Sequence, residues 1–198
     1  MQYQKEEVRQ RIIDAAFNEF EKNGFYRASI LQISNKAKVP IGNLYRYFKG
    51  KEALFHACVA GAYELSLEIV DSVFEKWLSL GGGFDEETAR YTVELLAKLS
   101  SEHSRSIRLL TEKSSGSEYA DFFNEITELG YKKLSEAFGR NAGRRPDEYL
   151  LRIIARNVTE GVLVVLTRCP GDRQRAVLFE LMLFYFKDLG ERVGGNAG

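Results

Sequence analysis

The sequence has few prolines, few cysteines and no long apolar run. Three prolines in 198 residues leave few helix breakers, which favours an all-α fold. The two cysteines, Cys58 and Cys169, form no C-x-x-C pair, so we expect neither a metal site nor a redox motif. The longest aliphatic run, residues 162–166, is far shorter than the roughly 20 residues of a membrane span, and the polar first residues lack the apolar core of a signal peptide. We therefore expect a cytoplasmic protein with no membrane partner.

Neither sign of charge dominates the chain, which has 28 basic and 28 acidic residues, but the charges are segregated. Residues 1–54 contain ten basic and six acidic side chains, a net charge of +4, and the remainder has a net charge of −4. A one-signed patch is what phosphate binding requires, whereas a solvated basic face is the ordinary alternative. The window between Glu21 and Glu52 has no acid and seven basic residues: Lys22, Arg27, Lys36, Lys38, Arg46, Lys49 and Lys51.

Apolar residues recur at helical spacing along the whole chain, and strand-like alternation is scarce. The pattern predicts a first helix that Asn23 and Gly24 end, followed by two short helices within residues 29–48. Ser29 and Gln32 have capping-box spacing at the start of the first short helix. Later helices are predicted at 51–80, 85–100, 104–113, 117–139, 147–168 and 172–192. A preceding helix, a short helix, a tight turn and a second short helix form a helix-turn-helix, whose second helix enters the DNA major groove.

Residues 29–54 carry a more specific signal. The segment Gly42-Asn43-Leu44-Tyr45-Arg46-Tyr47-Phe48, followed by Lys51-Glu52-x-Leu54, resembles the DNA-binding signature of TetR-family transcriptional regulators. The resemblance implies a three-helix helix-turn-helix domain over residues 1–50 and a larger helical effector-binding and dimerisation domain over residues 51–198. Two positions depart from the family pattern. Lys38 stands where glycine is usual, and Pro40 replaces a capping serine.

The resemblance also implies roles for individual residues. The second short helix would read base edges, with Gly42 allowing close approach of the backbone and Asn43 or Arg46 pairing with bases. Packing inside the small domain is the alternative for each tyrosine. The implied contacts with double-stranded operator DNA are Ser29, Gln32, Ile41, Gly42, Asn43, Tyr45, Arg46, Tyr47 and Lys51.

The second half is expected to act as a sensor and a dimer interface. The resemblance implies an unidentified small-molecule effector, and the abundant aromatics favour an apolar or aromatic one, although core packing also explains them. The last two predicted helices are apolar almost all round, which predicts either a homodimer interface or burial within a monomer. The candidate pocket comprises Tyr63, Trp77, Tyr91, Phe122, Phe123 and Ile126. The candidate dimer interface comprises Val158, Val162, Val165, Leu178, Met182, Tyr185 and Phe186.

Two other function classes compete with a ligand-released, dimeric repressor. An enzyme is disfavoured because the two histidines, His56 and His103, belong to no catalytic grouping or metal-ligand spacing, and no cofactor or metal is expected. The other alternative is a helical adaptor or hydrophobic-ligand carrier with a vestigial helix-turn-helix. DNA affinity that falls steeply with salt, together with a specific footprint, would argue against that alternative.

Overall fold

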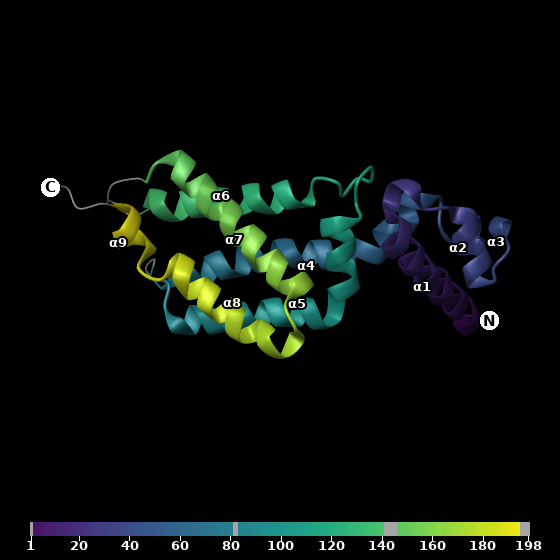
Figure 1. Cartoon of the computed structure of the whole chain (residues 1–198), viewed down its shortest axis with the longest axis horizontal. Coiled ribbons are helices and arrows are strands. Elements are labelled where there is room, and N and C mark those ends of the chain that lie inside the picture. The colour runs from purple at the N-terminus through teal and green to yellow at the C-terminus, as the bar shows by residue number, and fades with distance from the viewer. Residues whose placement is uncertain (1, 81–82, 141–145, 195–198) are drawn as a thin grey trace. The chain divides into compact units, whose positions relative to one another are not determined.

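The fold is all-α, as the sequence predicts. The computed structural model describes residues 2–80, 83–140 and 146–194, and over these ranges every regular element is a helix (Figure 1). The helices are α1 (Gln2–Arg27), α2 (Ile30–Ala37), α3 (Ile41–Tyr47), α4 (Lys51–Ser79), α5 (Glu86–Glu112), α6 (Phe122–Arg140), α7 (Glu148–Arg168), α8 (Gly171–Phe186) and α9 (Leu189–Gly194).

The chain divides into two compact units, and α4 and α5 each contribute several residues to both. The first unit comprises Met1–Tyr63 and Arg105–Phe122, and the second comprises Glu64–Ser104 and Phe123–Gly198. The first unit therefore extends beyond the 1–50 expected from the sequence. The additional residues come from the start of α4, the end of α5, the loop that follows α5 and the first residue of α6.

Some helix ends differ from the sequence-based prediction because backbone breaks fall inside helices or turns. Gly24 has a left-handed φ of 68°, yet α1 resumes and runs to Arg27, so this glycine kinks the helix instead of ending it. The two helices expected around residues 85–113 are one helix, α5, interrupted by non-helical angles at His103. The last predicted helix divides into α8 and α9, and Asp188, with a φ of 55°, lies between them.

Aromatic side chains fill the core of the first unit. Phe20 and Phe55 are fully buried, and their rings meet edge to face with centroids 4.9 Å apart. Phe25 packs against Phe55 at 5.2 Å, also edge to face. Leu44 of α3 is fully buried as well, so the second short helix is fixed to the core by its apolar side, while its other residues face outward.

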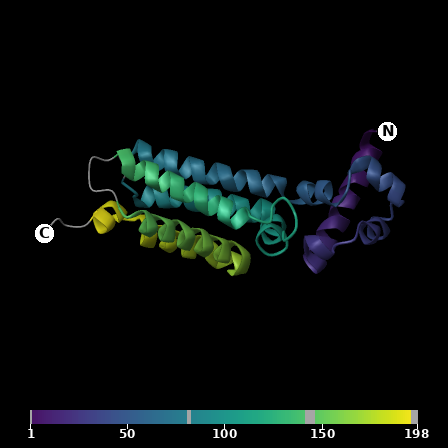
Figure 2. The ribbon, with the colours of Figure 1, turned by 90° about the horizontal axis from the view of Figure 1, so that it is seen from above.

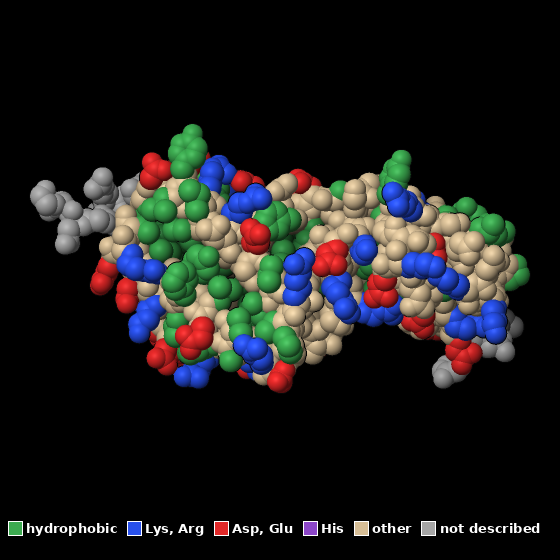
Figure 3. All heavy atoms as spheres, viewed as in Figure 1, with side chains coloured by type: hydrophobic (Ala, Val, Ile, Leu, Met, Phe, Trp, Pro, Cys, Tyr) green, Lys and Arg blue, Asp and Glu red, His purple; other side chains and the backbone are tan. Residues whose placement is uncertain are grey.

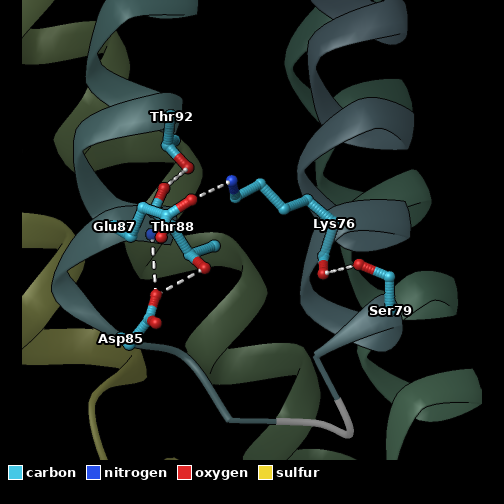
Figure 4. Close-up of polar contacts among 6 residues, drawn as sticks. All are labelled: Lys76, Ser79, Asp85, Glu87, Thr88 and Thr92. Carbon is cyan, nitrogen blue, oxygen red and sulfur yellow. Dashed lines mark hydrogen bonds and ion pairs between the residues drawn. The ribbon is translucent and has the colours of Figure 1, made fainter.

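The second unit is a helical bundle in which α7 and α8 lie side by side as one layer against α4, α5 and α6 (Figure 2). Trp77 of α4 is 3% exposed and contacts four phenylalanine rings: Phe74, Phe84, Phe138 and Phe186. At the start of α5, the Thr88 amide and hydroxyl both donate to the Asp85 carboxylate at 2.8 Å (Figure 4). The acidic N-terminus predicted here is therefore a side-chain cap.

One helix among the described residues, α4, is long and apolar enough to cross a membrane by length and composition. Its apolar residues, including Leu54, Phe55, Val59 and Ile69, are buried in the protein interior. A core helix of a bundle passes the same test of length and composition, so α4 is accounted for by packing.

Candidate nucleic-acid interface

A buried carboxylate joins α1 to α2. Glu19 is 2% exposed, and its oxygens accept hydrogen bonds from Lys36 Nζ at 2.8 Å, Asn23 Nδ2 at 2.7 Å and the Ser29 amide at 3.3 Å. The predicted capping box was wrong, because the Ser29 side chain makes no cap hydrogen bond. Glu19, three and seven positions after Ala16 and Ile12, lies on the apolar stripe of α1, which is the signal that could have identified it.

The charge of Glu19 is stabilised by its donors. Burial raises the pKa of this carboxyl group, but the hydrogen bonds from Lys36, Asn23 and Ser29 outweigh burial and hold the pKa below its ordinary value of 4.5. The ionised form therefore favours the folded protein at neutral pH. Its contribution is present above pH 4.5 and is lost as the pH falls through the lowered pKa of the folded state.

The turn between α2 and α3 is tight and left-handed. Lys38 has φ 54° and ψ 43°, a left-handed conformation that glycine adopts without steric cost. The Lys38 amide donates to Asn35 O and the Val39 amide to Ser34 O, while the Ser34 hydroxyl donates to Val39 O at 2.6 Å. Pro40 precedes α3 without a side-chain cap, and its carbonyl accepts from the Asn43 and Leu44 amides. These hydrogen bonds fix the turn despite the unfavourable angle of a lysine.

The outward side of α3 presents most of the predicted reading residues. Ile41, Gly42, Asn43, Tyr45 and Arg46 are exposed, and Tyr47 is half-buried. A Cβ added to Gly42 would meet no atom within 4 Å, so the internal packing of the chain gives no reason for a glycine there. In a DNA reader, a missing side chain at this position lets the helix backbone come close to the duplex.

Lys51 is engaged inside the first unit. Its ammonium donates to the carbonyls of Tyr26 at 3.1 Å and Ala28 at 3.4 Å and lies 4.6 Å from the centre of the Phe25 ring. Two of its three protons therefore hold the α1–α2 connection, and one is left for an external acceptor. The free basic groups beside α2 and α3 are instead the exposed Lys38, Arg46 and Lys49.

The predicted DNA contacts at the start of α2 differ in how far they are exposed. Gln32 is exposed and Ser29 half-buried. The sequence analysis missed Leu31, which is 53% exposed and stands two positions before the buried Ile33. Two positions correspond to opposite sides of a helix, and this spacing could have identified Leu31 as a surface residue. The exposed side chains of α2 and α3 therefore include hydrophobic as well as basic residues.

An apolar cavity of about 100 Å³ lies inside the second unit. Of the six candidate pocket residues, only Ile126 lines it. Tyr63 and Phe122 belong to the first unit, Trp77 is packed among other rings, Tyr91 is partly exposed, and Phe123 lies beneath Arg156. The lining is Ile69, Val70, Val73, Phe74, Thr92, Leu96, Ile126, Gly130, Leu134, Ala155, Val158, Thr159, Val162, Met182 and Phe186.

The candidate dimer residues also divide between interior and surface. Val165, Leu178, Met182 and Phe186 are buried in the subunit, at 0–7% exposure, and Val158, Val162 and Tyr185 are half-buried. The outward sides of α7 and α8 instead expose Ile153, Val164 and Phe184, the last at 70%. Figure 3 shows hydrophobic side chains gathered over these two helices.

The described residues contain no group of three or more His, Cys, Asp or Glu side chains that could hold a metal ion. Burial raises the pKa of the Cys58 thiol to about 12, so it stays protonated and unreactive.

Comparison with known proteins matches the first unit in sequence. Residues 12–58 match the family model for bacterial regulatory proteins, tetR family. The chain is 37% identical over 67 residues to the HTH-type transcriptional regulator UidR of Escherichia coli, a match covering 34% of each protein. It is 47% identical over 47 residues to the HTH-type transcriptional regulator HbdR of an Aromatoleum species, covering 24% of this chain and 20% of that protein. These matches therefore span about a third or less of the relatives.

The whole chain matches solved structures in fold. NalD, the secondary repressor of the MexAB-OprM multidrug efflux pump in Pseudomonas aeruginosa, superposes with a TM-score of 0.59 at 19% identity. The match covers 93% of this chain and 98% of that one. The helical arrangement of both units is thus shared, although little of the second-unit sequence is.

Lys38→Gly is expected to stabilise the protein by about 1 kcal/mol, because glycine adopts the left-handed angle without steric strain. The free energy of unfolding from urea denaturation measures the effect. Lys38→Ala is the matched control, since it removes the same side chain and keeps the strained angle. Equal stability of the two variants would contradict the strain argument.

Glu19→Gln is expected to lower the free energy of unfolding at pH 7 by about 1–3 kcal/mol, because the amide loses the charge that its three donors stabilise. The difference in unfolding free energy from the wild type should narrow as the pH falls below 4.5 and through the lowered pKa of the folded-state carboxyl group, because the charge-dependent stabilisation of the wild type is lost there. Denaturation across that pH range tests both statements. Glu102→Gln, at an exposed position, is the control for the same chemical change. A stability difference between Glu19→Gln and the wild type that does not vary with pH would contradict the stabilising role assigned to the Glu19 charge.

Proposed function

We propose that this chain is a DNA-binding transcriptional regulator of the tetR family, because residues 12–58 match the model of that family of bacterial regulatory proteins. In this proposal, the outward sides of α2 and α3 bind a palindromic operator in the major groove. The observation that carries the proposal is the exposed row on α3, where Gly42 leaves open space and no acidic side chain interrupts the basic surroundings. Ser29, Gln32, Ile41, Asn43, Tyr45, Arg46 and Tyr47 are the proposed contacts, and Lys51 mainly holds the α1–α2 connection.

We further propose that the protein is a repressor that a small apolar molecule releases from DNA. The cavity of the second unit supports this role, since five helices line it and no charged side chain does. Release requires that the molecule bind more tightly to the conformation that binds DNA poorly. α4 contributes residues both to this cavity and to the first unit, so it is the natural element to change between the two conformations.

Operator binding as a homodimer is the third part of the proposal. The outer faces of α7 and α8 carry the exposed apolar side chains Ile153, Val164 and Phe184. An apolar surface on two adjacent helices suits an isologous contact, in which each subunit offers the same face. This placement replaces the inward-facing Val165, Leu178, Met182 and Phe186 with outward residues of the same helices.

Gly42→Ala separates DNA binding from folding. The added methyl group has open space in the free protein, so stability should stay unchanged or rise by about 0.5–1 kcal/mol. Affinity for DNA should fall about tenfold, a loss of about 1.4 kcal/mol, because the helix backbone can no longer approach the duplex as closely. The probe is DNA selected by the wild-type chain from randomised duplexes, and binding is measured by fluorescence anisotropy.

Gly171→Ala is the matched control, since this glycine also opens a helix and has no neighbour within 4 Å of a Cβ. It should leave DNA affinity unchanged. Unchanged affinity of Gly42→Ala would contradict close backbone approach. Failure of the wild type to select any DNA would overturn the proposed function itself.

Phe184→Lys is expected to shift the protein from dimer to monomer, because it places a charge within an apolar contact between subunits. Sedimentation at several protein concentrations measures the change. Leu80→Lys is the control and should leave the protein dimeric, because Leu80, which is 48% exposed just after α4, lies outside the proposed interface. A Phe184 variant that remains dimeric, or a wild type that is monomeric, would contradict the proposed interface.

A further inference from the structure

The apolar cavity contains two hydroxyl groups, and only one of them is already used. Thr92 and Thr159 are the polar side chains of its lining. The Thr92 hydroxyl donates to the Thr88 carbonyl at 2.8 Å, one turn back in α5 (Figure 4). The Thr159 hydroxyl makes no hydrogen bond to the residues that the structure describes, and its oxygen stays accessible at the cavity wall, because none of the fully buried side-chain oxygens there lacks a partner.

The other threonines show how unusual this is. Thr111, Thr127 and Thr167 each donate to the carbonyl one turn back in their helices, and Thr88 donates to the Asp85 carboxylate. A threonine inside a helix normally satisfies its hydroxyl in this way. The Thr159 hydroxyl is accessible, so it carries no burial penalty, but it is free to pair with a polar group of a bound molecule, whereas the Thr92 hydroxyl is already bonded within its helix. Thr159 therefore marks the place in the cavity where a polar group of a bound molecule finds a hydrogen-bond partner.

We propose that Thr159 is the polar anchor of a binding site for small, uncharged, mostly apolar molecules that carry one hydroxyl or carbonyl group. This inference rests on the proposed function for its role as the effector site and deepens it by naming the chemical class. The cavity of about 100 Å³ fits a molecule close to the size of a single benzene ring. No lining side chain could neutralise a charge, so a carboxylate or an ammonium group is disfavoured.

The protein contains an intrinsic reporter for this site. Trp77 is its one tryptophan and is 3% exposed. Its ring lies 5.4 Å from Phe74 and 5.7 Å from Phe186, and both phenylalanines line the cavity. A molecule that enters the cavity changes the surroundings of these rings, so tryptophan fluorescence follows binding without a label.

The test is a titration of the full chain with benzene and with phenol, which differ by one hydroxyl group. Tryptophan is excited at wavelengths where neither compound absorbs. The wild type should bind phenol about tenfold more tightly than benzene, the ratio that corresponds to one net hydrogen bond. Thr159→Val keeps the side-chain shape but offers the phenol hydroxyl no partner, so the preference for phenol should be lost, while benzene should bind no more weakly than before.

Two variants provide controls. Thr92→Val removes the hydroxyl that is already bonded within its helix, so the preference for phenol should remain. Thr159→Ser keeps a hydroxyl and should retain most of the preference. If no compound binds, or if Thr159→Val keeps the wild-type preference, the anchor is overturned. Circular dichroism establishes that each variant is folded.

A separate measurement distinguishes this inference from the proposed function. DNA affinity of the wild type is measured with and without saturating phenol. Weakened DNA binding supports both the anchor and the effector role. If phenol binds but leaves the DNA affinity unchanged, the role of Thr159 as the polar anchor stands and the effector role of the cavity is overturned.

Discussion

The first unit depends on the buried carboxylate of Glu19. Three donors from two helices and the segment between them meet at its two oxygens. This single buried acid orients α2 against α1, and α3 follows because the turn at Lys38 is short and held by hydrogen bonds. The outward row on α3 therefore rests on a rigid support rather than on a loop, which a base-reading surface requires.

The same unit recruits a segment from the middle of the chain. Arg105 donates two hydrogen bonds to Glu21, at 2.8 and 2.7 Å, and one to Asn18 at 2.9 Å, and its guanidinium stacks on the Phe17 ring. The Phe25 amide donates to Lys113 O. Residues of α4 and α5 thus belong to both compact units. A conformational change in either helix therefore involves both units, because each helix is one continuous segment of the chain.

The apolar character of α7 and α8 serves three purposes in one chain. Their inward residues, such as Leu178 and Met182, fill the core, and Val158, Thr159 and Val162 line the cavity. Their outward residues, such as Val164 and Phe184, remain exposed. A helix that is apolar almost all round satisfies these demands together. Composition alone does not divide its residues among them.

The sequence by itself determined the helical class, the helix-turn-helix at residues 29–48 and the exposed face of α3, because helical periodicity and turn residues act locally. It also marked Lys38 as a departure from the family pattern, and the structure gives that residue its left-handed angle. Only the tertiary structure decided that Glu19 replaces the expected capping box, that Lys51 faces inward and that Ile126 alone of six candidates lines the cavity. These outcomes depend on contacts between residues far apart in sequence, such as Lys51 with the Tyr26 carbonyl. A periodic pattern shows which side of a helix is apolar but not what that side contacts.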